Sequence, residues 1–317
     1  TYPNGASVSS FTSGTTSPSN LTSFTYSLVM TQSVSGLTTS DFVNSGTATG
    51  CVFTPDISSG TTFTLTISSC GEATLIPQLL ANSVVDSLTS SNTPSAATNA
   101  STSITIDRTV PTSPSTPDLA TASDLGTSST DNITTSGTRT FTGTAEANST
   151  VQLFVDGVAS GSTCTATSGN YSCTTASLSA GTKSVTATAT DAAGNISSTS
   201  SAISIVIAAL PGSPTSVVST LTGSISNSAE VSFTVPGSDG GTPITGYTVT
   251  ATPTSGSAIT ATGTTSPITI YNLSWATTYT VTITAQNAIG SSTPAANGGS
   301  VKPVKAPDAP AHAAPVN

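Results

Sequence analysis

The sequence predicts an all-β protein made of three tandem β-sandwiches, and three observations support this prediction. Apolar residues alternate with Ser and Thr in many stretches, for example 184–190 and 280–286, which is the pattern of half-buried strands. No stretch keeps apolar residues at the three- and four-residue spacing of a capped amphipathic helix. Proline-rich segments also divide the 317 residues into pieces of about 100 residues, the size of one such sandwich.

Two proline-rich breaks give the expected domain boundaries. The alternating stretch 103–107 runs into a segment rich in proline at 111–117, and 202–207 runs into Pro211 and Pro214. Proline cannot donate to a sheet ladder and favours extended geometry in the residue before it, so each segment is predicted to be a short, stiff linker. The expected domains are 1–109, 110–209 and 210–305, followed by a Pro/Ala-rich tail at 306–317.

The composition excludes several classes of partner. Charged residues make up only 6% of the chain, against about 25% in typical soluble proteins. The five basic residues are scattered and the net charge is −9, so neither nucleic acid nor an anionic membrane surface is expected to bind. No apolar run approaches the roughly 20 residues that span a bilayer, so no membrane insertion is expected. The sequence begins at Thr1, without Met and without a signal-like apolar core, and the chain is interpreted as mature or trimmed.

The four cysteines form two local pairs, Cys51 with Cys70 and Cys164 with Cys173. Each pair falls within one expected domain and would close a short loop across neighbouring strands. A metal site is the alternative, but the spacings are not CxxC and the only histidine, His312, lies in the tail. We therefore predict two intramolecular disulfides and an oxidising compartment.

The third piece resembles a bacterial fibronectin type III domain. The resemblance rests on "PGSPTSV" (211–217), "EVSFTVPGSDGGTPITGYTVTATP" (230–253) and "ITIYNLSWATTYTVTITAQNAIGSS" (268–292). Phe233 stands where the family has a core Trp, and Leu273 and Tyr279 match the residues of its tyrosine corner. The alternation places an apolar set on the inward face of the strands, with threonines toward water. This set contains Tyr247, Val249, Val281 and Ile283.

The first two pieces resemble bacterial Ig-like domains of large surface adhesins. In the second piece the matching stretches are 123–158 and "LSAGTKSVTATATDAAGN" (178–195), and in the first they are 24–51 and 103–111. The ending "TDAAGN" has a counterpart in "QNAIGS" of the third piece, and we expect both to be turns near the end of a sandwich. "VVDSLTSSN" (84–92) is interpreted as a diverged counterpart in the first piece. The resemblance implies an extracellular protein, secreted or on a bacterial cell surface.

No enzymatic activity is expected. A Ser-His-Asp or Cys-His arrangement needs an imidazole held by the fold, and His312 lies among Pro and Ala residues. The acidic residues occur singly at expected turns, whereas catalytic carboxylate pairs need a shared cleft. Lys183 lies on the polar phase of its strand, which argues against an isopeptide crosslink. Tyr271 and Trp275 could stack on a sugar, but their place beside the tyrosine corner favours a packing role.

Calcium is the one cofactor that the resemblance suggests, because related surface repeats use it to stiffen domain junctions. Asp107, Asp191 and Asn195 lie at expected turns or linkers, where hard oxygen ligands could gather. No segment has the dense Asp spacing of a dedicated calcium loop. The alternative is that these residues are ordinary turn formers that hydrogen-bond their own backbone.

These observations predict a structural protein, a rigid rod that associates head to tail with copies of itself into a bacterial surface fibre. In this hypothesis the stretch 1–14, with Val8 and Phe11, inserts as a strand into a neighbouring subunit, and the tail, with Pro303 and Pro307, packs as a clamp. The alternative is an adhesin stalk, or the accessory binding modules of a secreted polysaccharide-degrading enzyme. That alternative would have cell-surface or matrix glycans as partners.

Overall fold

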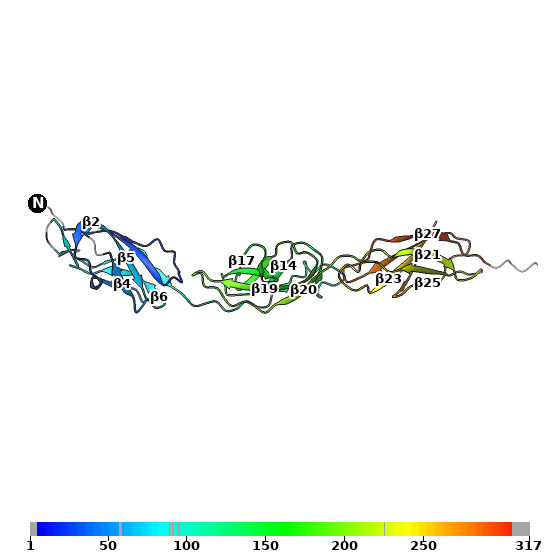
Figure 1. Ribbon diagram of the computed structural model, residues 1–317, viewed down its shortest axis with the longest axis horizontal. Coiled ribbons are helices and arrows are strands. Elements are labelled where there is room, and N and C mark those ends of the chain that lie inside the picture. Colours follow the sequence, from blue (N-terminus) through cyan, green and yellow to red (C-terminus); the bar gives the residue numbers. More distant parts are fainter. Residues whose placement is uncertain are drawn as a thin grey trace, which may run out of the picture.

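The computed structural model describes residues 5–56, 59–88, 90, 92–93, 96–224 and 226–305, and its regular structure is almost entirely β. Three β-sandwiches follow one another in a row, in chain order (Figure 1). Each sandwich has its own hydrophobic core, and the three cores share no residue. In the described part of the chain the one helical element is a single 3-10 turn, η1 (Thr39–Asp41). The all-β prediction is confirmed.

The first domain packs one large sheet against smaller ones. The large sheet has the order β4-β5-β2-β8-β9, with β1 also paired to β2. Its strands are β1 (Val8–Thr12), β2 (Ser23–Ser35), β4 (Val52–Pro55), β5 (Gly60–Ser68), β8 (Val84–Asp86) and β9 (Asn92–Thr93). The smaller sheets contain β3 (Phe42–Asn44), β7 (Pro77–Leu79) and β10 (Thr98–Asn99), and the pair β6 (Ala73–Leu75) and β11 (Ile104–Ile106).

The N-terminal stretch belongs to its own domain, which corrects the prediction that it inserts into a neighbour. β1 pairs antiparallel with β2, with Val8 opposite Met30 and Phe11 opposite Leu28. Phe11 is 2% exposed, and its ring meets Tyr26 edge-on with centroids 5.8 Å apart. This register directs Phe11 into the first core, so removing the stretch would remove a core strand rather than a free arm.

The interpretation of 84–92 as a diverged counterpart of "TDAAGN" stays a prediction. β8 pairs with β9 and with the end of β2, and Asp86 lies opposite Val34. Asp86 is fully buried and accepts the backbone N–H of Ala6 at 2.7 Å. β8 therefore holds the beginning of the described chain within the first domain.

The second domain is a two-sheet sandwich with one parallel pairing. One sheet has the order β12-β14-β18 and the other β13-β20-β19-β15-β16, with β17 also paired to β15. β13 runs parallel to β20 at the sheet edge. The strands are β12 (Asp118–Leu119), β13 (Ile133–Thr134), β14 (Thr140–Thr144), β15 (Thr150–Val155), β16 (Val158–Ala159), β17 (Cys164–Thr165), β18 (Asn170–Thr174), β19 (Gly181–Thr190) and β20 (Ile203–Ile207).

The third domain has a three-stranded sheet, β21-β22-β25, and a four-stranded sheet, β24-β23-β26-β27. Its inward-facing residues are buried as the alternation predicts, including Val249, Val281 and Ile283. The tyrosine corner is present, because the Tyr279 hydroxyl accepts the backbone N–H of Ser274 at 2.9 Å. The strands are β21 (Thr215–Leu221), β22 (Ala229–Thr234), β23 (Gly246–Pro253), β24 (Ile259–Gly263), β25 (Ile268–Ile270), β26 (Tyr279–Gln286) and β27 (Ala295–Val301).

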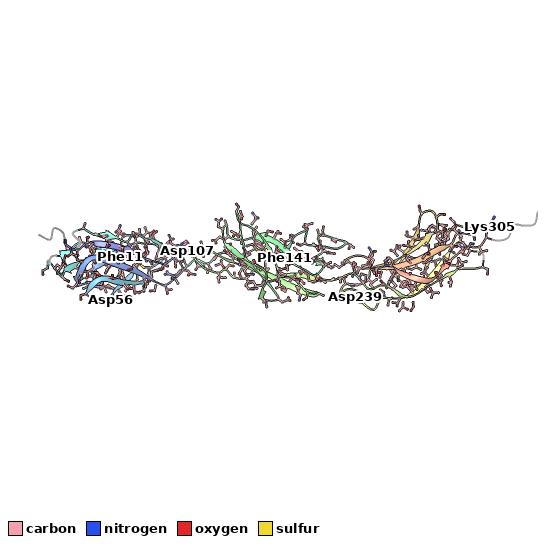
Figure 2. The ribbon with its side chains drawn as sticks, turned by 90° about the horizontal axis from the view of Figure 1, so that it is seen from above. Phe11, Asp56, Asp107, Phe141, Asp239 and Lys305 are labelled. Carbon is pink, nitrogen blue, oxygen red and sulfur yellow. A yellow bond between two sulfur atoms is a disulfide. The ribbon has the colours of Figure 1, made fainter. Side chains whose placement is uncertain are left out.

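The proline-rich segments are mostly packed rather than free. The prolines at 111, 114, 117, 211 and 214 are all buried. Only a few residues at each boundary, among them Val110 and Leu210, lie exposed between one core and the next. In Figure 2, Asp107 marks the first boundary and Asp239 lies beside the second.

Candidate functional site at the domain junctions

The turn 191–195, which follows β19, contacts the first domain. The Ala193 carbonyl accepts the backbone N–H of Asn20 at 3.3 Å, and the Asn195 side-chain amide donates to the Asp107 carbonyl at 3.0 Å. Gly194 has φ +94° and lies so close to Asn20 that an added Cβ would be 3.4 Å from its Nδ2. The turn thus holds both the body of the first domain and the segment that leaves it.

Asp191 orients the asparagine that reaches across this junction. Its two carboxylate oxygens accept the backbone N–H and the side-chain amide of Asn195, both at 2.8 Å. Burial alone would raise the pKa of Asp191, but the hydrogen bonds from Asn195 and from the backbone of Ala193 and Gly194 outweigh it and lower the pKa. Asp191 is therefore held in its charged, accepting form at neutral pH.

The second junction uses the equivalent turn of the third domain, after β26. The Ala288 carbonyl accepts both the backbone N–H and the hydroxyl of Thr127, each at 2.8 Å. Gly126, with φ +157°, permits this approach, because a Cβ there would lie 2.8 Å from the Ala288 oxygen. A backbone-to-backbone contact of this kind fixes two domains without any bulky side chain.

Asn287 fixes the segment that enters the third domain. Its amide nitrogen donates to the carbonyls of Ala209 and Asp239, both at 2.8 Å, while its oxygen accepts the N–H groups of Ile289 and Gly290. The side chain is 1% exposed, and all of its hydrogen-bonding groups have partners. Ala209 also donates to the Gly240 carbonyl at 2.7 Å, so this linker is held from both sides.

The structure brings together the three residues predicted for calcium. The Asp107 carbonyl, the Asp191 carboxylate and the Asn195 amide meet at the first junction, with the amide nitrogen donating to both oxygens. Among the described residues, no group of three or more His, Cys, Asp or Glu side chains could hold a metal ion. Calcium at this turn stays a prediction. A melting temperature that differs between calcium and chelator would support it, and identical curves would contradict it.

Both predicted disulfides are present. Cys51–Cys70 closes the β4–β5 hairpin, whose first and last residues, Val52 and Ser68, are paired. Cys164–Cys173 differs from the expected hairpin closure, because β17 and β18 belong to opposite sheets. This second disulfide therefore ties the two layers of the second sandwich together.

Tyr271 and Trp275 do not pack in the core, which corrects the sequence interpretation. Tyr271 is 62% exposed and Trp275 is 41% exposed, in the loop between β25 and β26. Pro303 is buried against its own domain, where its carbonyl accepts the N–H of Ala276 at 2.9 Å, so it is not free to clamp a neighbour. Pro307 lies outside the described residues.

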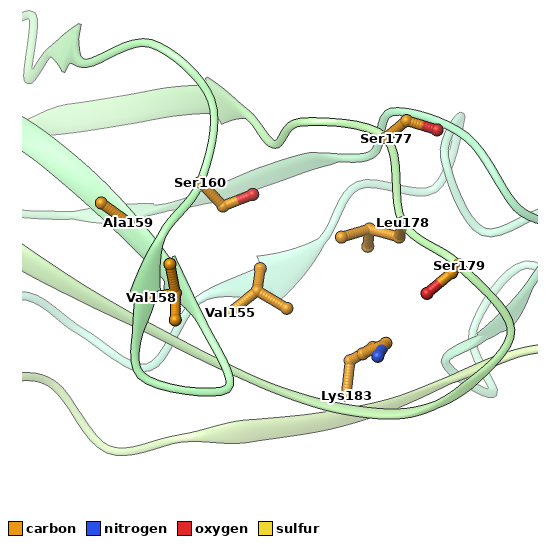
Figure 3. A pocket seen from close by; sticks show the side chains of 8 residues that line it. All are labelled: Val155, Val158, Ala159, Ser160, Ser177, Leu178, Ser179 and Lys183. Atoms are coloured by element: carbon orange, nitrogen blue, oxygen red, sulfur yellow. The ribbon is translucent and has the colours of Figure 1, made fainter.

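A shallow hollow on the second domain offers no catalytic arrangement. Figure 3 shows its lining of small side chains, including Ser160, Ser177 and Leu178, with Lys183 at one side. The hollow has a volume of about 210 Å³, below the size of most ligand sites. Lys183 is engaged, since its Nζ lies 3.4 Å from an oxygen of Asp156.

The second domain contains two buried charged residues, Arg139 and Asp124, and each is held by hydrogen bonds. Arg139 is 8% exposed and donates to the carbonyls of Thr135, Ser136 and Thr138, and burial lowers the pKa of its guanidinium. Asp124 accepts the N–H of Asn132 at 3.1 Å, and burial raises the pKa of its carboxyl. Arg139 also donates to the Thr135 hydroxyl at 2.7 Å, and the nearby carboxylates of Asp131 and Asp118 add to the raised pKa of Asp124.

The fold and the two junctions define a tandem β-sandwich protein whose domains are joined end to end. Residues 109–208 match the family model of the bacterial Ig-like domain, and residues 212–298 match that of the fibronectin type III domain. The chain therefore contains a bacterial Ig-like domain followed by a fibronectin type III domain, as the sequence resemblance predicted. Both kinds of domain are typically non-catalytic modules.

Comparison with solved structures finds similar chains. Domains A168–A170 from titin are 14% identical, covering 92% of this chain and 96% of that chain, with a TM-score of 0.43. The chicken CNTN1 FN1–FN3 domains are 14% identical, covering 96% and 99%, with a TM-score of 0.35. The FN5 domain of Drosophila Lar is 23% identical, covering 30% and 98%, with a TM-score of 0.25. Comparison with curated proteins gives no match.

The bacterial Ig-like domain and the two disulfides are consistent with an extracellular protein. In the part of the chain that the structure describes, no helix is long and apolar enough to cross a membrane.

The junction residues Asn20, Gly126, Thr127 and Asn287 were not among the predicted site residues. Asn287 lies in a repeated turn, "DAAGN" in one domain and "NAIG" in the next, whereas no sequence signal marked Asn20, Gly126 or Thr127. The repeat indicates a shared local structure, but the partner of each turn lies in another domain.

Proposed function

We propose that the chain is a non-enzymatic extracellular structural protein, a rod of three domains that serves as the subunit of a bacterial surface fibre. The observation that supports this most is the direct hydrogen bonding at both junctions. Asn195 binds the Asp107 carbonyl and Asn287 binds the Ala209 carbonyl, so neither boundary contains a slack linker. A series of domains joined in this way transmits a pulling force along one axis and resists bending.

The surface composition suits a subunit that packs beside its copies. With 6% charged residues, few like charges oppose lateral or end-to-end contact. A fibre requires a head-to-tail contact, because only a heterologous interface propagates without closing. The sequence predicted two segments for assembly, the N-terminal stretch and the tail. Because the N-terminal stretch pairs within the first domain, we assign the head-to-tail contact to the tail, 306–317.

Electron microscopy of the purified protein at increasing concentration tests this function. We expect linear polymers whose repeat matches the length of one rod, and deletion of 306–317 should shorten or abolish them while the three domains stay folded. A protein that remains monomeric at every concentration would contradict the fibre function. It would leave the second candidate, an adhesin stalk or accessory module, which the exposed Tyr271 and Trp275 favour.

A further inference from the structure

We infer that the loop between β25 and β26 of the third domain is a binding site for a neutral glycan, with Tyr271 and Trp275 as its stacking residues. The inference goes beyond the structural role, because it assigns a ligand to the rod whether or not the rod polymerises. It starts from the two most exposed aromatic side chains of the described chain, 62% and 41% exposed, which lie four residues apart in one loop.

These two residues are more exposed to solvent than the other aromatic side chains that the structure describes. Every other described Phe and Tyr is buried or half-buried, Tyr279 and Phe233 among them. Trp275 is the one tryptophan in the sequence. Among the described residues, both exposed aromatic side chains therefore lie in one loop. Tyr and Trp are enriched where proteins bind partners.

The loop that carries them is held rigidly. The N–H of Leu273 donates to the Asn227 carbonyl at 2.8 Å, the N–H of Ser274 to the Tyr279 hydroxyl, and the N–H of Ala276 to the Pro303 carbonyl. Asn272 and Ala276 adopt positive φ values of 62° and 58°, which turn the chain at both sides of Trp275. A rigid scaffold reduces the entropy lost on binding, so the rings are preorganised for a ligand.

The loop lies near the end of the third domain that points away from the second domain. Pro303, which binds the loop, lies two residues before Lys305, and Figure 2 shows Lys305 at that end. Lys302 is exposed beside the loop and forms no ion pair with the described residues. Its ammonium group is available to donate hydrogen bonds to hydroxyl groups of a ligand.

The chemistry of the surface favours a neutral glycan over two other partners. The internal junctions join domains through Asn, Thr and Gly with backbone carbonyls, and neither uses an exposed aromatic ring. Another domain of this kind is therefore a poor match for the loop. Polyanions such as nucleic acid or acidic polysaccharide are bound by clusters of basic residues, and this end of the third domain offers Lys302 and Lys305 rather than such a cluster. The apolar C–H face of a neutral sugar ring stacks on Trp or Tyr, and its hydroxyl groups suit the surrounding donors.

Titration of the whole protein with soluble oligosaccharides tests the inference, since Trp275 fluorescence reports directly on the site. The probes are hexamers of cellulose, xylan, chitin and starch, with alginate oligomers and heparin as acidic counterparts. We expect at least one neutral hexamer to shift the emission of Trp275, with little dependence on salt. Tyr271→Ala should weaken that binding roughly tenfold, and Trp275→Ala should weaken it at least as much when measured by calorimetry. Val158→Ala, at an exposed position of the second domain, is the matched control and should leave it unchanged.

Three outcomes would overturn the inference. The first is that no neutral probe binds, and the second is that binding persists in both aromatic variants. The third is that only the acidic probes bind. If the two variants instead abolish polymers seen by electron microscopy while no sugar binds, the loop is a contact between copies, and the fibre function stands without the glycan site. If sugar binds and no polymer forms, the fibre function fails and the glycan site stands.

Discussion

At the residue scale, the junctions depend on a few side chains whose hydrogen-bonding capacity is fully used. Asn287 is the clearest case, because its amide joins the linker at Ala209, the loop at Asp239 and its own turn. An aspartate at this position would direct a carboxylate at two carbonyl oxygens. An alanine would leave those carbonyls without their donor.

We therefore expect Asn287→Ala to lower the free energy of unfolding of the third domain by about 1–3 kcal/mol, and Asn287→Asp to lower it further. Urea denaturation followed by Trp275 fluorescence measures this domain alone, because the chain has a single Trp. Gln286→Ala, at the exposed neighbouring position, is the control and should cost little. Equal midpoints for the Ala variant and the control would show that the buried amide does not stabilise the domain.

Asp191 gives the first junction a dependence on pH. Its hydrogen bonds lower the pKa below the unfolded value of about 3.9. A carboxyl with a lowered folded pKa contributes stability above the unfolded pKa, and this contribution is lost as the pH falls through the folded pKa. Asp191→Asn should accordingly destabilise the second domain at pH 7 and make much less difference at pH 2.5. Denaturation followed by circular dichroism at both pH values checks this, and a variant deficit that is the same at both would contradict it.

At the element scale, the strands follow from the sequence more completely than their surroundings do. The alternation in β23 and β26 predicts which side chains are buried, because the side-chain period of a strand is two. The same argument applies to β1, whose alternation fits a strand but does not say which sheet receives it. Phe11 could not be assigned to its own core from the pattern alone, since pairing with β2 and pairing with a neighbour bury the same face.

For the loops, the sequence pattern predicted less about which side chains are buried and what they contact. Nothing in the spacing of Tyr271 and Trp275 distinguishes packing from exposure, because both lie outside the alternating strands. The junction contacts of Asn20 with Ala193 and of Thr127 with Ala288 join residues more than 150 positions apart in the chain. Such contacts depend on how whole domains meet, which local sequence patterns do not encode.

The disulfides act at this scale too, each within one domain. Replacing Cys164 and Cys173 by Ala should lower the stability of the second domain by about 2–4 kcal/mol, because the crosslink restricts the unfolded chain. Replacing Cys51 and Cys70 should affect only the first domain. Non-reducing peptide mapping of the unmodified protein should find both bridges and no free thiol. A bridge between domains, or an unchanged unfolding midpoint in the first double variant, would contradict this account.

At the scale of the whole molecule, the structure relies on short contacts between successive domains rather than on large interfaces. The second junction is the clearest example. There Gly126 lies against the Ala288 carbonyl, and Thr127 donates two hydrogen bonds to the same carbonyl. Because Gly126, Thr127 and Ala288 lie outside both hydrophobic cores, a disturbance here should change the angle between domains rather than the fold of either. The stiffness of the rod should therefore be separable from the stability of its parts.

Gly126→Ala tests this separation. A Cβ placed 2.8 Å from the Ala288 oxygen must push the third domain away and lengthen both hydrogen bonds from Thr127. We expect small-angle X-ray scattering to show a broader range of maximum dimensions for this variant, while the unfolding midpoint of the third domain, followed by Trp275, changes little. Gly237→Ala is the matched control, since a Cβ there meets no atom within 4 Å. Identical scattering from Gly126→Ala and the control would mean that the rod is straight for a reason other than this contact, and the proposal of a stiff subunit would lose its physical basis at this junction.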